Sequence, residues 1–168
     1  MLGQIFGKVA EAEQIEPDFD AAVERVKAAY DSDDSVMSVI TSGGEIGYSA
    51  PGVGRTFGPL YDLLGLTPAL EVDDSSTDHQ GDDISVEAIA DSNPDWLLVM
   101  DRDAAVSADD PEYVAGADVI EASEPLANVT AVKDAQVVYM PADTYTNEGI
   151  QTYTEFFNEL ADALEAAK

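Results

Sequence analysis

Two of the chain's three arginines lie in segments suited to holding an anionic ligand. Arg55 lies within the glycine-rich segment 52–58, and Arg102 closely follows an apolar run over residues 96–100 that predicts a strand. A guanidinium group is planar and presents several donors in a fixed geometry, which suits multidentate contact with an anion. Loops that follow parallel strands meet at one edge of a sheet, so we expect both arginines to reach a common ligand there.

The surroundings of these arginines leave a second interpretation open. Each can instead pair with a local acid, such as Asp101 or Asp103 beside Arg102, and then have only a structural role. The remaining arginine, Arg25, lies in a segment with helical spacing, and we expect it on a solvated helix face.

The single histidine and one tyrosine are candidate metal ligands. His79 lies in the polar segment 76–81, which is a poor place for a core histidine, and Tyr145 follows a predicted strand at 136–140. Imidazole and phenolate together suit ferric iron. Simple surface exposure would explain either residue on its own, and this interpretation also stays open.

The motifs of common enzyme classes do not occur in the sequence. Gly52, Gly54 and Gly58 approach a dinucleotide-binding fingerprint, but the third glycine comes one residue too late. The chain has no cysteine, no phosphate-binding lysine loop and no HExxH motif. We therefore predict a binding protein, with no catalytic residues and no intrinsic cofactor.

The charge of the chain excludes two classes of partner. With 35 acidic and 7 basic residues, the net charge is −28, and such a surface repels nucleic acid and anionic lipid. No apolar run approaches the length of a membrane span, and the N-terminus lacks the pattern of a signal peptide. If the protein is exported, we expect its signal and any membrane anchor to lie outside these 168 residues.

Strands and helices alternate along the chain. Apolar residues at helical spacing predict a helical opening over 2–30, broken or restarted at Pro17. Strands are predicted at 35–40, 45–49, 96–100 and 136–140, and helices at 60–64, 85–90 and 149–167. A loop is predicted at 101–111, and weakly helical structure at 113–132. This alternation predicts an α/β fold, a Rossmann-like three-layer αβα lobe with a mostly parallel central sheet.

Several segments match one protein family in order and in spacing. They include Gly54-Arg55-Thr56-Phe57-Gly58, Asn93-Pro94-Asp95-Trp96 with the strand through Asp101-Arg102, and Gln136-Val137-Val138-Tyr139-Met140-Pro141, and the match extends over nearly the whole chain. On these segments the chain resembles the C-terminal lobe of iron–siderophore binding proteins of ABC transporters. The resemblance is to class III periplasmic binding proteins of the catecholate (enterochelin) type.

The resemblance implies a two-lobed receptor that binds its cargo between the lobes, with residues 1–168 as a single C-terminal lobe. It implies that Arg55 and Arg102 grip an anionic ferric complex, and that His79 and Tyr145 complete the iron shell. Glu87 corresponds to a surface glutamate that docks on the permease, although an acid in a first helical turn also simply favours the helix dipole. The implied partners are a ferric siderophore and the permease, and the implied location is a periplasm or the cell surface, with a lipid anchor.

Two alternatives to siderophore binding remain at this stage. A haem or cobalamin-type ligand would keep the chain within the same transporter superfamily. A receiver-like signalling domain is suggested by the strand that ends in Asp101 and Asp103, although the chain lacks the early acidic pair expected of such domains.

Overall fold

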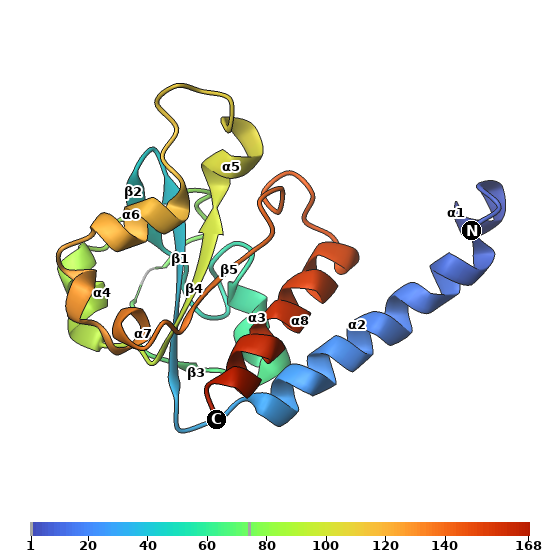
Figure 1. The fold of residues 1–168 in the computed structure, drawn as a ribbon, viewed down its shortest axis with the longest axis horizontal. Helices are drawn as coiled ribbons and strands as arrows, with labels where there is room; N and C mark the ends of the chain where they lie inside the picture. Colours follow the sequence, from blue (N-terminus) through green and yellow to red (C-terminus); the bar gives the residue numbers. More distant parts are fainter. Residues whose placement is uncertain (1, 74) are drawn as a thin grey trace.

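A single mixed sheet forms the centre of the fold, in the order β2-β1-β4-β5, with β3 paired to the start of β1 (Figure 1). This computed structural model describes residues 2–73 and 75–168. The β1–β3, β1–β4 and β4–β5 pairs are parallel, and β2 joins β1 as an antiparallel hairpin arm. The strands are β1 (Ser35–Ser42), β2 (Glu45–Tyr48), β3 (Thr67–Pro68), β4 (Trp96–Asp101) and β5 (Val137–Tyr139).

Helices cover both faces of the sheet, and each face has its own apolar core. Side chains alternate along β4, so that Leu98 and Met100 join one core while Leu97 and Val99 join the other. The first core is completed by α2 (Val9–Ala29), α3 (Gly58–Leu64) and α8 (Ile150–Ala166). The second is completed by α4 (Val86–Ser92), α6 (Gly116–Ala122), the 3-10 turn Leu126–Asn128 and α7 (Thr130–Lys133). The predicted three-layer α/β fold is therefore confirmed.

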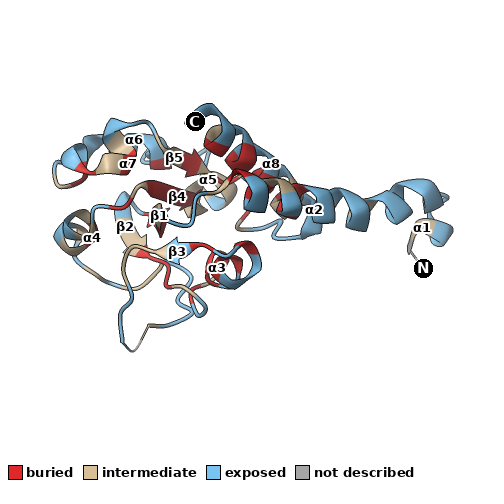
Figure 2. Ribbon diagram, turned by 90° about the horizontal axis from the view of Figure 1, so that it is seen from below, coloured by how far each residue is buried: buried red, intermediate tan, exposed pale blue. Residues whose placement is uncertain are grey.

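The long helix α2 projects beyond the body of the domain. Its N-terminal half and the short α1 (Leu2–Ile5) are largely exposed, whereas its C-terminal half packs on α8 (Figure 2). Arg25 contributes to that packing, because its guanidinium group pairs with Glu165 at 2.7 Å and also with Asp162. Arg25 thus links two helices, rather than standing free on a solvated face.

The prediction that Pro17 breaks the opening helix is wrong, because α2 continues through it. A proline inside a helix removes one hydrogen bond and crowds the preceding turn. Pro17 lies on the exposed half of α2, where water can hydrate the freed carbonyl group. Helix-forming alanine and glutamate residues flank it on both sides.

Most other predicted elements are present, with two differences. Ser85 caps α4, since its hydroxyl accepts a hydrogen bond from the Ala88 N–H at 3.2 Å, and α3 ends at Gly65 in the left-handed conformation. The loop predicted at 101–111 instead begins with the short helix α5 (Arg102–Val106). The two-residue strand β3 carries no periodic signal and was not predicted. Within the described residues, no helix combines the length and hydropathy needed to cross a membrane.

Candidate ligand-binding site

The candidate site lies at the edge of the sheet where β1, β4 and β5 end. Three connections meet at this edge: the glycine-rich loop that follows β2, the turn from β4 into α5, and the loop between β5 and α8. The parallel strands β4 and β5 direct the segments that follow them to this edge. The glycine-rich loop follows the antiparallel strand β2 instead, and it folds back so that Arg55 meets Tyr145 here.

Tyr145 brings the two predicted arginines together. The guanidinium carbon of Arg55 lies 4.8 Å from the centroid of the Tyr145 ring, and that of Arg102 lies 5.0 Å from the same centroid. Both distances fall within the range of attraction between a cation and an aromatic face. The sequence-predicted convergence of Arg55 and Arg102 is therefore present in the structure, with Tyr145 as the shared contact.

The loop that carries Arg55 has a tightly constrained backbone. A Cβ atom on Gly54 would lie 2.4 Å from the Ala50 nitrogen, so only glycine fits there. The Ser49 hydroxyl donates to the Arg55 carbonyl oxygen at 2.9 Å. Thr56 has φ +67°, a conformation that a β-branched residue adopts only under strain. These constraints fix the backbone from which the Arg55 side chain extends.

Arg102 is held by the turn between β1 and β2. Its Nη1 atom lies 2.8 Å from Asp103 Oδ1 and 3.4 Å from the Ser42 hydroxyl, while Asp103 Oδ2 accepts from the Gly43 N–H at 2.5 Å. The neighbouring Tyr145 side chain, followed by Asp103, raises the pKa of Arg102 against the opposing effect of burial. The pairing with Asp103 that the sequence left open is therefore present, together with the contact to Tyr145.

His79 shares an open hollow with Arg55 and Tyr145. Ser76, Thr77 and Asp78 also line this hollow. The His79 side chain is 48% exposed, and its Nδ1 atom lies 3.7 Å from Asp78 Oδ1.

The loop that carries His79 is packed closely against β2. The Gln80 carbonyl oxygen lies so near Gly47 that any Cβ there would be 2.0 Å away from it. The Gln80 side-chain amide also donates to the Ser42 hydroxyl at 3.2 Å. This contact places the histidine segment beside the end of β1, and so beside the two arginines.

The protein alone supplies few donors for a metal ion. Across the part of the chain that the structure describes, no group of three or more histidine, cysteine, aspartate or glutamate side chains is arranged to hold one. His79 and Tyr145 line one hollow, and as two side chains they do not by themselves complete the coordination shell of a metal ion.

Sequence reasoning missed Glu148, which lies immediately before the N-cap of α8. Its Oε2 atom lies 3.8 Å from Arg55 Nε, and its Oε1 atom accepts a hydrogen bond from the Tyr153 hydroxyl at 2.6 Å. Glutamate is abundant in this chain, so composition gave no signal for this residue. Only the fold brings the start of α8 beside the glycine-rich loop.

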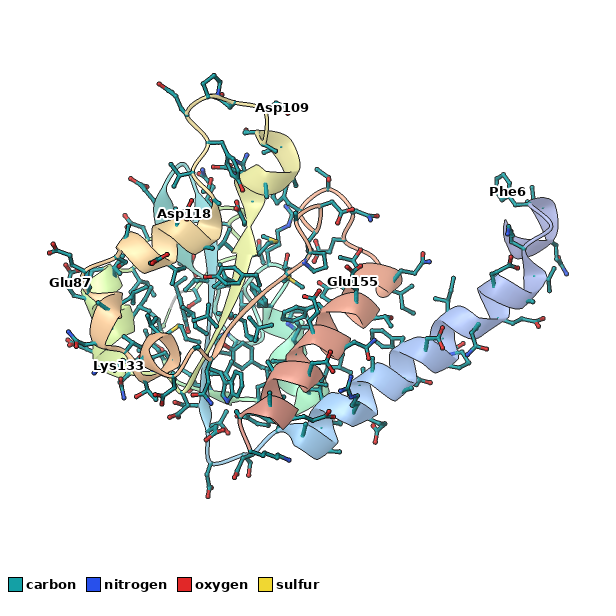
Figure 3. All side chains as sticks on the ribbon, viewed as in Figure 1. Phe6, Glu87, Asp109, Asp118, Lys133 and Glu155 are labelled. Atoms are coloured by element: carbon teal, nitrogen blue, oxygen red, sulfur yellow. The ribbon has the colours of Figure 1, made fainter. Side chains whose placement is uncertain are left out.

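Two other acids of interest lie apart from the hollow or have structural roles. Glu87 is exposed in the first turn of α4, on a flank of the domain (Figure 3), and does not line the hollow. Asp101 caps α5 through the Ala104 N–H at 3.0 Å, and its other oxygen accepts from the Tyr113 hydroxyl and the Gly116 N–H, both at 2.7 Å. Both carboxylate oxygens of Asp101 are thus engaged in holding the local fold.

The chain is similar to proteins that bind iron chelates. It is 29% identical over 167 residues to the petrobactin-binding protein YclQ of Bacillus subtilis, an alignment that covers 98% of this chain and 50% of that protein. It is 31% identical to the ferric-anguibactin-binding protein FatB of Vibrio anguillarum over 149 residues, which cover 86% of this chain and 42% of that protein. The chain thus spans about half the length of these relatives.

Solved structures of such proteins are also similar to this chain in fold. The crystal structure of YclQ matches with a TM-score of 0.75 and 27% identity, over 98% of this chain and 55% of the other. The siderophore-binding protein BauB, solved with two molecules of acinetobactin and ferric iron, matches with a TM-score of 0.72 and 25% identity, over 97% and 55% of the two chains. The sequence profile of the periplasmic binding proteins matches residues 1–144, and the chain belongs to this family.

Proposed function

We propose that this chain is the C-terminal lobe of a two-lobed substrate-binding protein that holds an anionic ferric siderophore of the catecholate type. The bound complex is delivered to the permease of an ABC importer. Its similarity to about half of YclQ and FatB, and the names of the ligands that those proteins bind, support the proposal. The family is extracytoplasmic, and we place this protein in a periplasm or on the cell surface as a lipoprotein.

The observation that carries the proposal is the placement of both site arginines over one tyrosine ring. Catecholate oxygens bear negative charge and accept hydrogen bonds, which suits two guanidinium groups that approach the same aromatic ring. Tyr145 holds the two cations near each other, so that a single anionic complex can contact both.

Iron is cargo in this proposal, not a resident cofactor. When a siderophore leaves coordination positions of the ferric ion open, we propose that His79 and Tyr145 fill them. Their shared place on one hollow supports this assignment, and imidazole and phenolate are suitable donors for ferric iron.

The exposed half of α2 supports the assignment of a second lobe. Ile5, at the end of α1, and Phe6, which precedes α2, are 65% and 73% exposed, and both are large apolar residues. Figure 3 shows Phe6 at the end that projects from the domain. We propose that this end of the chain packs against the other lobe, and that α2 helps to connect the two.

The proposal is tested by titrating the two-lobed protein with a ferric catecholate siderophore and following the quenching of its tryptophan and tyrosine fluorescence. Arg55→Ala and Arg102→Ala should each weaken binding by about tenfold or more, or about 1.4 kcal/mol. Arg25→Ala, which removes an arginine remote from the hollow, serves as the matched control and should bind normally. Binding that is indifferent to Arg55 and Arg102 would contradict the proposal.

The same preparation tests the haem alternative, because haem ligation shifts the Soret absorption band. A shift with haemin, together with no quenching by ferric catecholates, would replace the siderophore with haem. The receiver-like alternative predicts a free acceptor carboxylate, whereas both oxygens of Asp101 are hydrogen-bonded in the fold.

A further inference from the structure

Both arginines of the site already have a carboxylate partner. Asp103 lies 2.8 Å from Arg102, and Glu148 lies 3.8 Å from Arg55. A third acid, Asp78, lines the hollow beside His79. The carboxylates of Asp103, Glu148 and Asp78 therefore offset the charge of the two guanidinium groups, and this lobe does not present a strongly positive surface to its ligand.

The two paired acids have different roles in the fold. Asp103 accepts one hydrogen bond from the Gly43 backbone N–H and another from the Arg102 side chain. It therefore holds both the β1–β2 turn and the arginine in place. Glu148 receives no backbone hydrogen bond within the described residues; its partners are the side chains of Arg55 and Tyr153. Among the described residues, the Glu148 carboxylate therefore makes polar contacts only with the side chains of Arg55 and Tyr153, whereas Asp103 also holds the backbone of the β1–β2 turn.

Tyr153 fixes the position of the Glu148 carboxylate. Its ring packs on Phe157, 5.9 Å between centroids, and its hydroxyl lies 2.6 Å from Glu148 Oε1 and 3.1 Å from the Thr56 carbonyl oxygen. Burial, and then the nearby carboxylate, raise the pKa of Tyr153, so the phenol keeps its proton and remains a donor. The Glu148 side chain is 27% exposed, so solvent weakens the field of its carboxylate only in part.

We propose that Glu148 is a specificity-determining residue that makes the site discriminate among ferric complexes by their net charge. A ferric ion with three catecholates carries three net negative charges, whereas one with two catecholates carries one. A fixed carboxylate beside Arg55 repels both complexes, but it repels the more highly charged one more strongly. The site therefore favours complexes of low negative charge, and this inference rests on the proposed function.

The test compares a hexadentate tris-catecholate siderophore with a tetradentate bis-catecholate one, both loaded with ferric iron. Fluorescence quenching of the two-lobed protein gives a dissociation constant for each, and their ratio is the selectivity. Glu148→Gln keeps the size of the side chain and an oxygen acceptor for Tyr153, so the fold should be retained. We expect it to shift the selectivity about tenfold toward the tris-catecholate complex.

Two further variants complete the experiment. Glu155→Gln removes the same charge from an exposed position on α8 and should leave the selectivity unchanged at about 0.15 M salt, where charges are screened over about 8 Å. Tyr153→Phe removes the hydrogen bond that fixes Glu148, and should produce a smaller shift in the same direction as Glu148→Gln.

The possible results separate the two levels of the proposal. If Glu148→Gln and Glu155→Gln both keep the wild-type selectivity while both complexes bind, Glu148 does not determine the selectivity. The proposed function then still stands. If neither ferric complex binds the wild-type protein, the proposed function itself is wrong, and the inference falls with it.

Discussion

Arg55 and Tyr145 are in contact across the candidate site, with 4.8 Å between the guanidinium carbon and the ring centroid. Arg55 comes from the loop after β2, and Tyr145 from the loop after β5. Because Arg102 approaches the same ring, one aromatic side chain supports both positive charges. Removal of that ring should therefore affect both arginines at once.

Tyr145→Ala is expected to weaken ferric catecholate binding by about tenfold or more, since both guanidinium groups lose their shared contact. Tyr145→Phe keeps the ring and should retain the arginine geometry. Any affinity that the phenylalanine variant loses measures the contribution of the phenol oxygen, including ligation of iron. Quenching titrations of the two-lobed protein give both values, and an alanine variant that binds like the wild type would rule out the supporting role of the ring.

Gly54→Ala should destabilise the fold by about 1–3 kcal/mol, the usual cost of inserting a methyl group where no space exists. The new Cβ atom would lie 2.4 Å from the Ala50 nitrogen and 2.6 Å from the Ser49 hydroxyl oxygen, so the loop that carries Arg55 must move. The matched control is Gly149→Ala, because a Cβ atom there meets nothing within 4 Å. Urea denaturation measures both variants, and an equal cost for the two would refute the steric explanation.

The strands and the site arginines could be predicted from the sequence for clear physical reasons. The apolar run that forms β4 is buried on both faces, so its pattern is strong, and the end of β4 brings Arg102 to the binding edge of the sheet. Arg55 reaches the same place by a different route, because its loop follows β2, which is antiparallel to β1. The match to the periplasmic binding proteins confirms the family to which the resemblance pointed, and with it the prediction of a binding protein rather than an enzyme.

The acids that pair with these arginines were harder to predict. Asp103 was considered because it adjoins Arg102 in sequence, but Glu148 reaches Arg55 only through packing of α8 on the sheet. Such a contact between two loops has no periodicity, and one glutamate among 35 acidic residues carries no compositional signal. A proline removes one helical hydrogen bond, so the sequence predicts a break at Pro17. The structure has no break there, because α2 is long enough to tolerate the lost hydrogen bond.

Tyr48 should make the stability of the domain sensitive to alkaline pH. Burial, with smaller effects from Glu71 and Asp82, raises the pKa of Tyr48 to about 12 from an ordinary value of 10.0. A raised pKa means that the folded state favours the neutral phenol. The contribution of this group to the free energy of unfolding is therefore complete below pH 10 and is lost as the pH rises toward 12.

We expect the melting temperature of the wild-type protein to fall more steeply between pH 10 and 12 than that of Tyr48→Phe. At neutral pH the phenylalanine variant should be less stable by about 1 kcal/mol, because the Tyr48 hydroxyl no longer donates to the Leu70 carbonyl oxygen, at 2.6 Å in the native fold. Identical pH profiles for the two proteins would contradict the assignment to Tyr48.

Glu87 provides the test of permease docking. It is exposed in the first turn of α4, away from the hollow, so a charge reversal there should leave the ligand site intact (Figure 3). If Glu87 docks on a basic surface of the permease, Glu87→Arg places a like charge there and is expected to lower siderophore-dependent stimulation of the transporter ATPase by about tenfold or more. The affinity for the ferric siderophore should not change.

The control for this reversal is Glu155→Arg, which alters the same charge on α8, at a different part of the surface (Figure 3). It should stimulate the ATPase normally. The competing explanation is that Glu87 only favours the dipole of α4, an effect of about 0.3–1 kcal/mol. In that case Glu87→Arg would lower the melting temperature slightly and leave stimulation of the transporter at the wild-type level, so stability and ATPase measurements on the same two variants distinguish docking from helix stabilisation.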